Sequence, residues 1–198
     1  MSRAEQVQTL REIFERAKLA PRDKEGCFED LHLRGEVFHA LICAGRDQLT
    51  ELRDYVYEYI TDPYEDFRSE AVESLGWDTG FNDKEFQKNE AYQIWLNDPS
   101  EDVRRVALVA WARYHAFSKN PMVIKYLYNI FRSDKYSFDI RSCALSNFIH
   151  VADAQTYPRE IMDILELGEI EDKKTFLASM DWGKINRIMD QYVPNWRK

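Results

Sequence analysis

The stretch ITDPYEDFRSEAVESLGW, residues 60–77, decides the fold, because it joins one turn to one amphipathic helix. An Asp-Pro pair presets the turn, and two acidic residues follow where the helix begins, so that their charge meets the positive end of the helix dipole. Phe67, Ala71 and Leu75 are spaced four residues apart. This spacing predicts one buried helical face.

The same pattern recurs along the chain. FRSEAVESL from Phe67 aligns with VRRVALVAW from Val103 and with IRSCALSNF from Ile140, and a weaker copy, LRGEVFHAL, begins at Leu33. Turn aspartates 36 residues apart and a helix arginine recur in the three clear copies: Asp62, Asp98 and Asp134, with Arg68, Arg104 and Arg141. Agreement in turn, arginine and apolar spacing indicates an internal repeat.

Each copy is predicted to form two antiparallel helices, since apolar residues recur at three- and four-residue spacing throughout the chain. In the first clear copy these helices are expected over residues 46–60 and 66–77, and further continuous helices are expected over residues 83–97 and 121–132. We therefore expect an all-α fold of about five helix pairs in one domain over residues 1–198. The clear repeats are predicted over residues 46–77, 83–117 and 121–152, and degenerate terminal repeats over residues 4–44 and 158–192.

The repeated pattern, Asp-Pro-x-x-Asp-(Val/Phe)-Arg-x-x-Ala, resembles the HEAT repeat in its compact bacterial style. The third copy has Lys135 in place of the proline. The resemblance implies a right-handed α-α superhelix, a solenoid, in which turn aspartates and helix arginines form a structural ladder between adjacent repeats. The alternative is that the three arginines, which lie in register, bind phosphate. We favour the ladder because each arginine has carboxylates two and six or seven residues upstream.

The negative charge is concentrated in the middle of the chain. The formal net charge is -8, and residues 46–102 alone hold sixteen aspartates and glutamates against five lysines and arginines. Such a region repels phosphate backbones and attracts a basic partner, so a protein is expected as the partner and nucleic acid is not. The alternative is a solvated acidic face that maintains solubility.

The composition predicts a cytoplasmic protein without a membrane segment. No apolar run approaches the roughly 18 residues that span a bilayer, and the first residues, MSRAEQVQTLREIFERA, carry charge throughout. The three cysteines, Cys27, Cys43 and Cys143, lie far apart and outside any CxxC spacing, so we interpret them as buried, reduced thiols.

The sequence contains no recognisable catalytic or cofactor motif. The four histidines do not form an HExxH motif or a short cluster of ligands, and phosphate-binding glycine loops and nucleophile elbows are absent. No metal, cofactor or catalytic residue is therefore expected.

Positions beside the buried face of each second helix are the candidate binding surface, because helical solenoids commonly bind on the inside of their curve. The candidates are Glu70, Glu73, Trp77, Val109, Arg113 and His150. Tryptophan and arginine often anchor protein interfaces, and the two glutamates would supply an acidic rim. The alternative for Trp77 is that it packs under the loop at residues 77–83.

These features favour a non-enzymatic scaffold that binds another protein. In its specific version, the chain resembles immunity proteins that neutralise a toxic, often basic effector. One alternative is similarity to the HEAT-like alkylpurine DNA glycosylases, although the net negative charge of the middle repeats would repel the phosphates of DNA. Another is similarity to the helical-repeat lyases that attach bilins, for which no selective motif is found.

Overall fold

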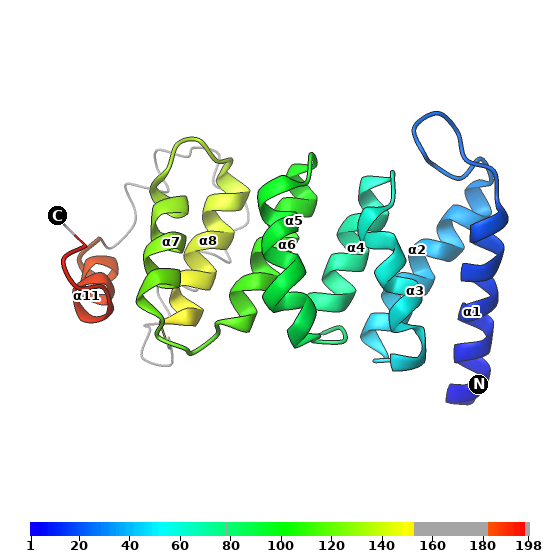
Figure 1. The fold of residues 1–198 in the computed structure, drawn as a ribbon, viewed down its shortest axis with the longest axis horizontal. Coiled ribbons are helices and arrows are strands. Elements are labelled where there is room, and N and C mark those ends of the chain that lie inside the picture. Colours follow the sequence, from blue (N-terminus) through cyan, green and yellow to red (C-terminus); the bar gives the residue numbers. More distant parts are fainter. Residues whose placement is uncertain (78, 153–181, 197–198) are drawn as a thin grey trace. The chain divides into compact units, whose positions relative to one another are not determined.

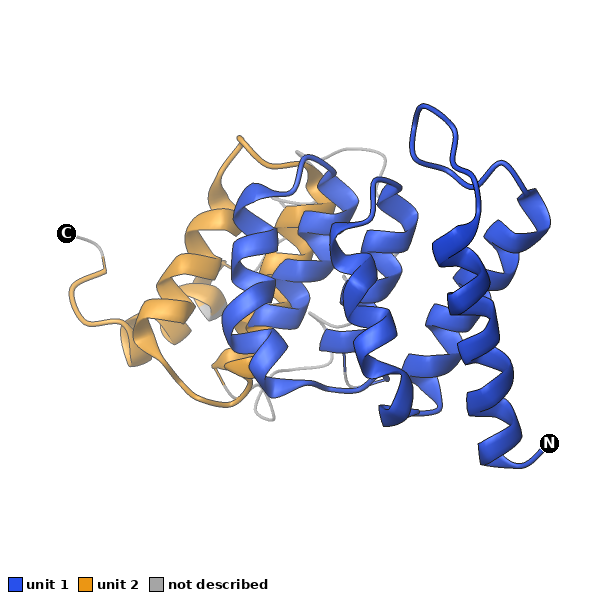
Figure 2. Ribbon diagram, turned by 45° about the vertical axis from the view of Figure 1, so that its right-hand side comes forward, with its two compact units in different colours: residues 1–111 blue, residues 112–198 orange. Residues whose placement is uncertain are grey.

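The computed structural model describes residues 1–77, 79–152 and 182–196. These residues form nine α-helices, short 3-10 and π-helical turns and one isolated β-bridge, which confirms the predicted all-α class for this part of the chain. Two compact units are formed, Met1–Trp111 and Ala112–Lys198 (Figure 2). Their boundary lies inside the second predicted repeat, and the single-domain assignment stays a prediction.

Helices α1 (Arg3–Leu19) and α2 (Leu31–Arg46) begin at polar caps. Ser2 forms a capping box with Glu5, and the Asp30 carboxylate accepts hydrogen bonds from the first backbone amides of α2. Such caps satisfy amide groups that have no partner within the helix. The predicted terminal repeat over residues 4–44 thus corresponds to two full helices, which contact each other.

The loop between α1 and α2 is ordered by a feature that was not predicted. Arg22 and Phe28 form an antiparallel bridge, and Gly26 between them has a φ of +83°. A Cβ on Gly26 would lie 2.2 Å from the Cβ of Pro63. The loop therefore packs directly against the Asp-Pro turn, and glycine is needed there for both conformation and space.

The first helix of the second pair is shorter than predicted. In place of one helix over residues 46–60, the chain forms η1 (Thr50–Leu52), α3 (Arg53–Glu58) and η2 (Tyr59–Thr61). Helix α4 (Glu65–Gly76) follows the Asp-Pro turn as predicted. Within the first unit, α2 contacts α1, α3 and α4, and α3 contacts α4 (Figure 1).

The third pair also departs from a uniform helix. Residues predicted as one helix from position 83 form η3 (Phe86–Glu90), a π-helical turn, and α5 (Ala91–Asn97), and α6 (Glu101–Tyr114) follows. The Gln87 side chain is fully buried and donates a hydrogen bond to the Gly76 carbonyl at 2.6 Å. Such π-helical turns are rare and occur mostly as single turns next to α-helical residues, as here before α5.

The second unit contains α7 (Pro121–Arg132), α8 (Phe138–Val151) and α11 (Trp182–Tyr192). Helices α7 and α8 contact each other, and α7 also contacts α11. The predicted terminal repeat over residues 158–192 is described only from residue 182 onward, and its remainder lies outside the described residues.

The buried helical faces agree with the predicted repeat register. Each position that was expected to face the core is at most 9% exposed: Phe67, Ala71, Leu75, Val103, Ala107, Trp111, Ile140, Ala144 and Phe148. Small residues in the middle of each triplet allow neighbouring helices to approach closely.

Candidate functional site

An acidic pocket lies between the second helices of the first two pairs. It has a volume of about 310 Å³ and is lined by α2, α4 and the loop after α4. We call it the α2–α4 pocket, and its lining residues are Ile42, Arg46, Glu70, Glu73, Ser74, Thr79 and Gly80. The structure therefore places two of the predicted surface residues, Glu70 and Glu73, in one cavity.

Close contact between α2 and α4 builds the floor of this pocket. The Ser74 hydroxyl donates a hydrogen bond to the Leu41 carbonyl at 3.0 Å, and a Cβ on Gly45 would lie 2.7 Å from the Ser74 side chain. A Cβ on Gly80 would lie 2.1 Å from the Ser74 carbonyl oxygen. Backbones that approach this closely leave little room for adjustment, so the glutamates lie on a rigid support.

Glu70 is held in an electrostatically unfavourable position. Burial of its carboxyl group, reinforced by the negative charge of Glu73, raises the pKa of Glu70 to about 7. Its one hydrogen-bond contact is with the Ser74 hydroxyl at 3.4 Å, whose single proton is shared with the nearer Leu41 carbonyl. No lysine or arginine of the described residues forms an ion pair with Glu70. The pocket therefore presents a carboxylate whose charge is incompletely compensated.

Arg46 borders the pocket, but its guanidinium group contacts other partners. It donates hydrogen bonds to the Asp47 carboxylate at 3.0 and 3.3 Å and to the Cys43 sulfur at 3.5 Å. The same sulfur lies 3.3 Å from the His39 ring. Burial raises the pKa of the Cys43 thiol, which disfavours the thiolate that a nucleophile or metal ligand requires.

Trp77 and Val109 do not form an open surface beside the two glutamates. The Trp77 side chain is half-buried, and its indole N–H donates to the Val106 carbonyl on α6 at 3.4 Å. Val109 is only 8% exposed, so little of its side chain is accessible on this face, and its assignment to a binding surface stays a prediction. Every residue from Val106 to Ala112 is buried, which leaves this part of α6 without a solvent face.

Arg113 and His150 belong to the second unit. Arg113 is half-buried, while His150 is exposed on α8 with its ring centroid 4.8 Å from that of Phe117. Of the six predicted surface residues, two line the α2–α4 pocket of the first unit: Glu70 and Glu73.

Arg68 and Asp98 meet in a buried ion pair. The Arg68 guanidinium donates two hydrogen bonds to the Asp98 carboxylate, at 2.9 and 3.0 Å, across 30 residues of sequence. It also donates to the carbonyls of Asp62 and Pro63 in its own turn. Both ionised side chains are at most 10% exposed, so this contact joins one Asp-Pro turn to the next.

The other predicted ladder residues make different contacts. Arg104 repeats the two contacts to its own turn carbonyls, at 2.8 and 3.0 Å. Arg141 instead binds the Asp134 carboxylate within its own turn at 3.1 Å and the Phe131 carbonyl at 2.9 Å. These arginines therefore hold turns together, which leaves less of their charge for a phosphate ligand.

Asp62 has a partner that the repeat pattern did not indicate. Arg22, from the loop between α1 and α2, binds its carboxylate through two hydrogen bonds at 2.7 and 3.0 Å. Arg34, the residue in register with the repeated arginines, instead lies over the Tyr64 ring at 4.2 Å. No local sequence signal singled out Arg22, because it lies outside the repeat.

Neither a metal site nor a membrane span is found in the residues that the structure describes. Across these ranges, no three histidine, cysteine, aspartate or glutamate side chains are grouped as metal ligands. No helix there combines the length and apolar character needed to cross a bilayer.

Comparison with known proteins gives no further guide to this site. No protein-family model, curated protein or solved structure matches the chain.

Proposed function

We propose that the chain is a non-enzymatic scaffold that binds a basic protein through the α2–α4 pocket. The repeat pattern and the packing of successive helix pairs support a HEAT-like arrangement, with a right-handed solenoid as its expected form. In this proposal a lysine or arginine side chain of the partner enters the pocket and lies beside Glu70 and Glu73.

The single observation that carries the proposal is the position of Glu70. A half-buried carboxylate beside a second carboxylate costs free energy whenever it is charged, and this cost is reflected in its raised pKa. A cationic side chain placed between the two glutamates would remove that cost. Binding would thus be driven by an interaction that the unbound protein lacks.

Internal ion pairs make the pocket more distinct from the surrounding acidic surface. Several acidic side chains in the middle of the chain are already neutralised by arginine or lysine: Glu51 by Arg3, Glu58 by Lys18, Asp62 by Arg22, Asp83 by Arg53 and Asp98 by Arg68. Glu70 has no such ion pair in the described ranges. A basic partner would therefore be attracted to the pocket more than to the rest of this surface.

A more specific version of the proposal is that the partner is a toxic effector and the chain its immunity protein. The acidic character of residues 46–102 supports it, since negative charge speeds capture of a basic effector. The same charge disfavours the DNA glycosylase alternative, because a phosphate backbone would be repelled. No specific observation favours the bilin lyase alternative.

Affinity capture from the source cell tests the proposal. The full chain serves as bait beside a variant that carries Glu70→Gln and Glu73→Gln, which keeps the shape of the pocket and removes its charge. We expect a basic protein to be captured by the natural chain and to bind the variant about 10-fold or more weakly. If the captured protein is a toxin encoded beside this chain, the immunity version is supported.

The matched control removes two charges elsewhere. Glu12→Gln with Glu25→Gln alters two exposed residues outside the pocket, and at pH 8.5, where Glu70 is mostly ionised, it changes the net charge by about the same amount. This control should bind like the natural chain. Equal weakening by both variants would show that overall charge, rather than the pocket, governs binding, and the proposal would be rejected.

A further inference from the structure

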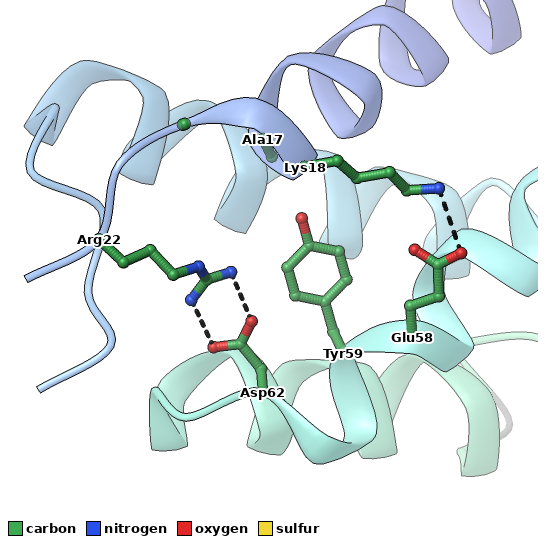
Figure 3. A pocket seen from close by; sticks show the side chains of 7 residues that line it. Ala17, Lys18, Arg22, Glu58, Tyr59 and Asp62 are labelled. Carbon is green, nitrogen blue, oxygen red and sulfur yellow. Dashed lines mark hydrogen bonds and ion pairs between the residues drawn. The ribbon is translucent and has the colours of Figure 1, made fainter.

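A second pocket lies where the end of α1 meets α3 and η2. It has a volume of about 290 Å³, and its lining residues are Ala17, Lys18, Ala20, Arg22, Glu58, Tyr59 and Asp62. We call it the α1–α3 pocket, and Figure 3 shows it from close by. This volume lies near the lower limit for ligand pockets, so only a small molecule would fit.

Tyr59 presents a buried hydroxyl group to this pocket. The residue is only 6% exposed, and its ring packs against Phe14 and Phe67. Figure 3 shows the hydroxyl directed between two ion pairs, toward the end of α1. No group in the described residues forms a hydrogen bond with this hydroxyl.

A buried hydroxyl group without a protein partner points to a ligand. Leaving such a group unsatisfied costs about 1–3 kcal/mol, and a phenylalanine would fill the same space in the core without that cost. Burial also raises the pKa of Tyr59, so its phenol stays neutral and can donate a hydrogen bond. The hydroxyl is thus suited to an acceptor atom that enters the pocket.

Two ion pairs fix the charged groups around Tyr59. Lys18 lies 3.2 Å from Glu58, and Arg22 binds Asp62 through two hydrogen bonds while its guanidinium lies 4.1 Å from the Phe28 ring centroid. These contacts hold each cation in place without using every N–H group. The pocket therefore offers oriented donors before any ligand binds.

The charges of the pocket select the class of ligand. Two cations and two carboxylates line it, so their formal charges cancel and a ligand of high net charge is disfavoured. The carbonyl end of α1 adds partial negative charge, which favours an ammonium group nearby. A molecule with both a carboxylate and an ammonium group matches this arrangement.

We propose that the α1–α3 pocket binds a small zwitterion of the α-amino acid type. The ligand carboxylate accepts hydrogen bonds from the Tyr59 hydroxyl and from Lys18 or Arg22. Its ammonium group lies toward Glu58, Asp62 and the end of α1. This inference is independent of the proposed protein-binding function, because the two pockets share no lining residue.

Calorimetric titration of the full chain with each of the twenty common amino acids tests the inference. We expect saturable binding of at least one of them at about 10 mM or below. Acetate, methylamine and inorganic phosphate serve as probes of the separate charges, and each should bind at least about 10-fold more weakly. Absence of amino acid binding, or tighter binding of phosphate, would overturn the proposal.

Variants then locate the binding site. Tyr59→Phe should keep the fold and weaken amino acid binding about 10-fold, because it removes only the hydroxyl group. Tyr57→Phe is the matched control two residues earlier, in α3, since Tyr57 lies outside the pocket and packs against Phe86. Lys18→Met provides a second test and should also weaken binding. Unchanged binding by both pocket variants would reject this site.

Discussion

Among single residues, Arg68 combines deep burial with two kinds of partner. Its guanidinium binds the Asp98 carboxylate and two carbonyls of its own turn, and only 10% of its side chain is exposed. Removing one member of a buried ion pair leaves the other charge without compensation. The effect of a substitution should therefore depend on whether an arginine binds a buried carboxylate or only backbone carbonyls.

Arg68→Ala is expected to lower the free energy of unfolding by about 3 kcal/mol, as is typical when a buried pair is broken. Arg104→Ala should cost only about 1 kcal/mol, because Arg104 donates to two carbonyls, its side chain is 28% exposed, and its ion pair with the exposed Glu101, at 3.9 Å, is weak. Urea unfolding of both variants measures the difference. Equal losses would show that the buried Arg68–Asp98 pair adds nothing beyond the turn contacts.

Glu70 makes stability depend on pH in a predictable direction. Because its pKa is raised to about 7 in the folded protein from 4.5, the folded state holds a proton more tightly than the unfolded state. The contribution of Glu70 to the free energy of unfolding is therefore most favourable below pH 4.5, and it is lost as the pH rises through about 7. The charged form is the one that destabilises the fold.

Glu70→Gln should consequently stabilise the protein at pH 8 by on the order of 1 kcal/mol, after allowance for solvent screening of a half-buried group. The gain should nearly disappear at pH 5, where the natural glutamate is mostly protonated. Thermal unfolding at both pH values checks this, and Glu12→Gln serves as an exposed control. A gain that does not change with pH would contradict the burial of Glu70 as its cause.

The residues that the sequence could predict are those whose role repeats. Phe67, Ala71 and Leu75 were found from spacing alone, and they are buried. Glu70 and Glu73 do not repeat in the other copies; they line one pocket, and their binding role stays a prediction. Residue-specific partners could not be found in this way. The contact between Arg22 and Asp62 spans 40 residues and starts in a loop, so no periodic pattern encodes it.

At the scale of helices, the approach of α2 to α4 depends on small residues. Gly45→Ala would place a Cβ 2.7 Å from the Ser74 side chain, so the two helices must separate. We expect a loss of about 1–3 kcal/mol, the usual cost of overpacking. Chemical denaturation measures this loss, and binding by the adjacent α2–α4 pocket should weaken with it.

Gly35→Ala is the matched control on the same helix. A Cβ at Gly35 meets no atom within 4 Å, and the position is exposed within α2. Alanine should therefore stabilise the protein by about 0.5–1 kcal/mol through its higher helix propensity. If both substitutions changed stability in the same direction, close packing at Gly45 would not be the determining factor.

The positions of the helices were easier to predict from the sequence than their type, whether α, 3-10 or π. Helices α1, α4 and α7 begin within one residue of their expected positions, because caps, acidic first turns and prolines mark them. The segments at 46–60 and 83–97 were expected to be continuous but contain 3-10 or π-helical turns. All three helix types place apolar residues three to five positions apart, so periodicity could not separate them.

For the whole molecule, the distribution of charge matters more than its total. Basic residues from the first 45 positions neutralise acidic residues of the middle segment, as in the pairs Arg3–Glu51, Lys18–Glu58 and Arg22–Asp62. The sequence showed the excess of acidic residues but not which of them are paired. A net charge of -8 nevertheless remains, and it acts over a distance that depends on salt.

The association rate with the partner recovered by affinity capture should therefore fall about 10-fold or more when salt is raised from about 20 to about 500 mM. Dissociation should change much less, because contacts inside the pocket are shielded from solvent ions. Stopped-flow or surface-based kinetics at several salt concentrations measures both rates. Duplex DNA is the opposing probe and should not bind, since its phosphates carry the same sign of charge as the chain. Tight binding of duplex DNA that is insensitive to salt would reject the view of an acidic protein-binding scaffold, whatever the kinetics with the captured protein.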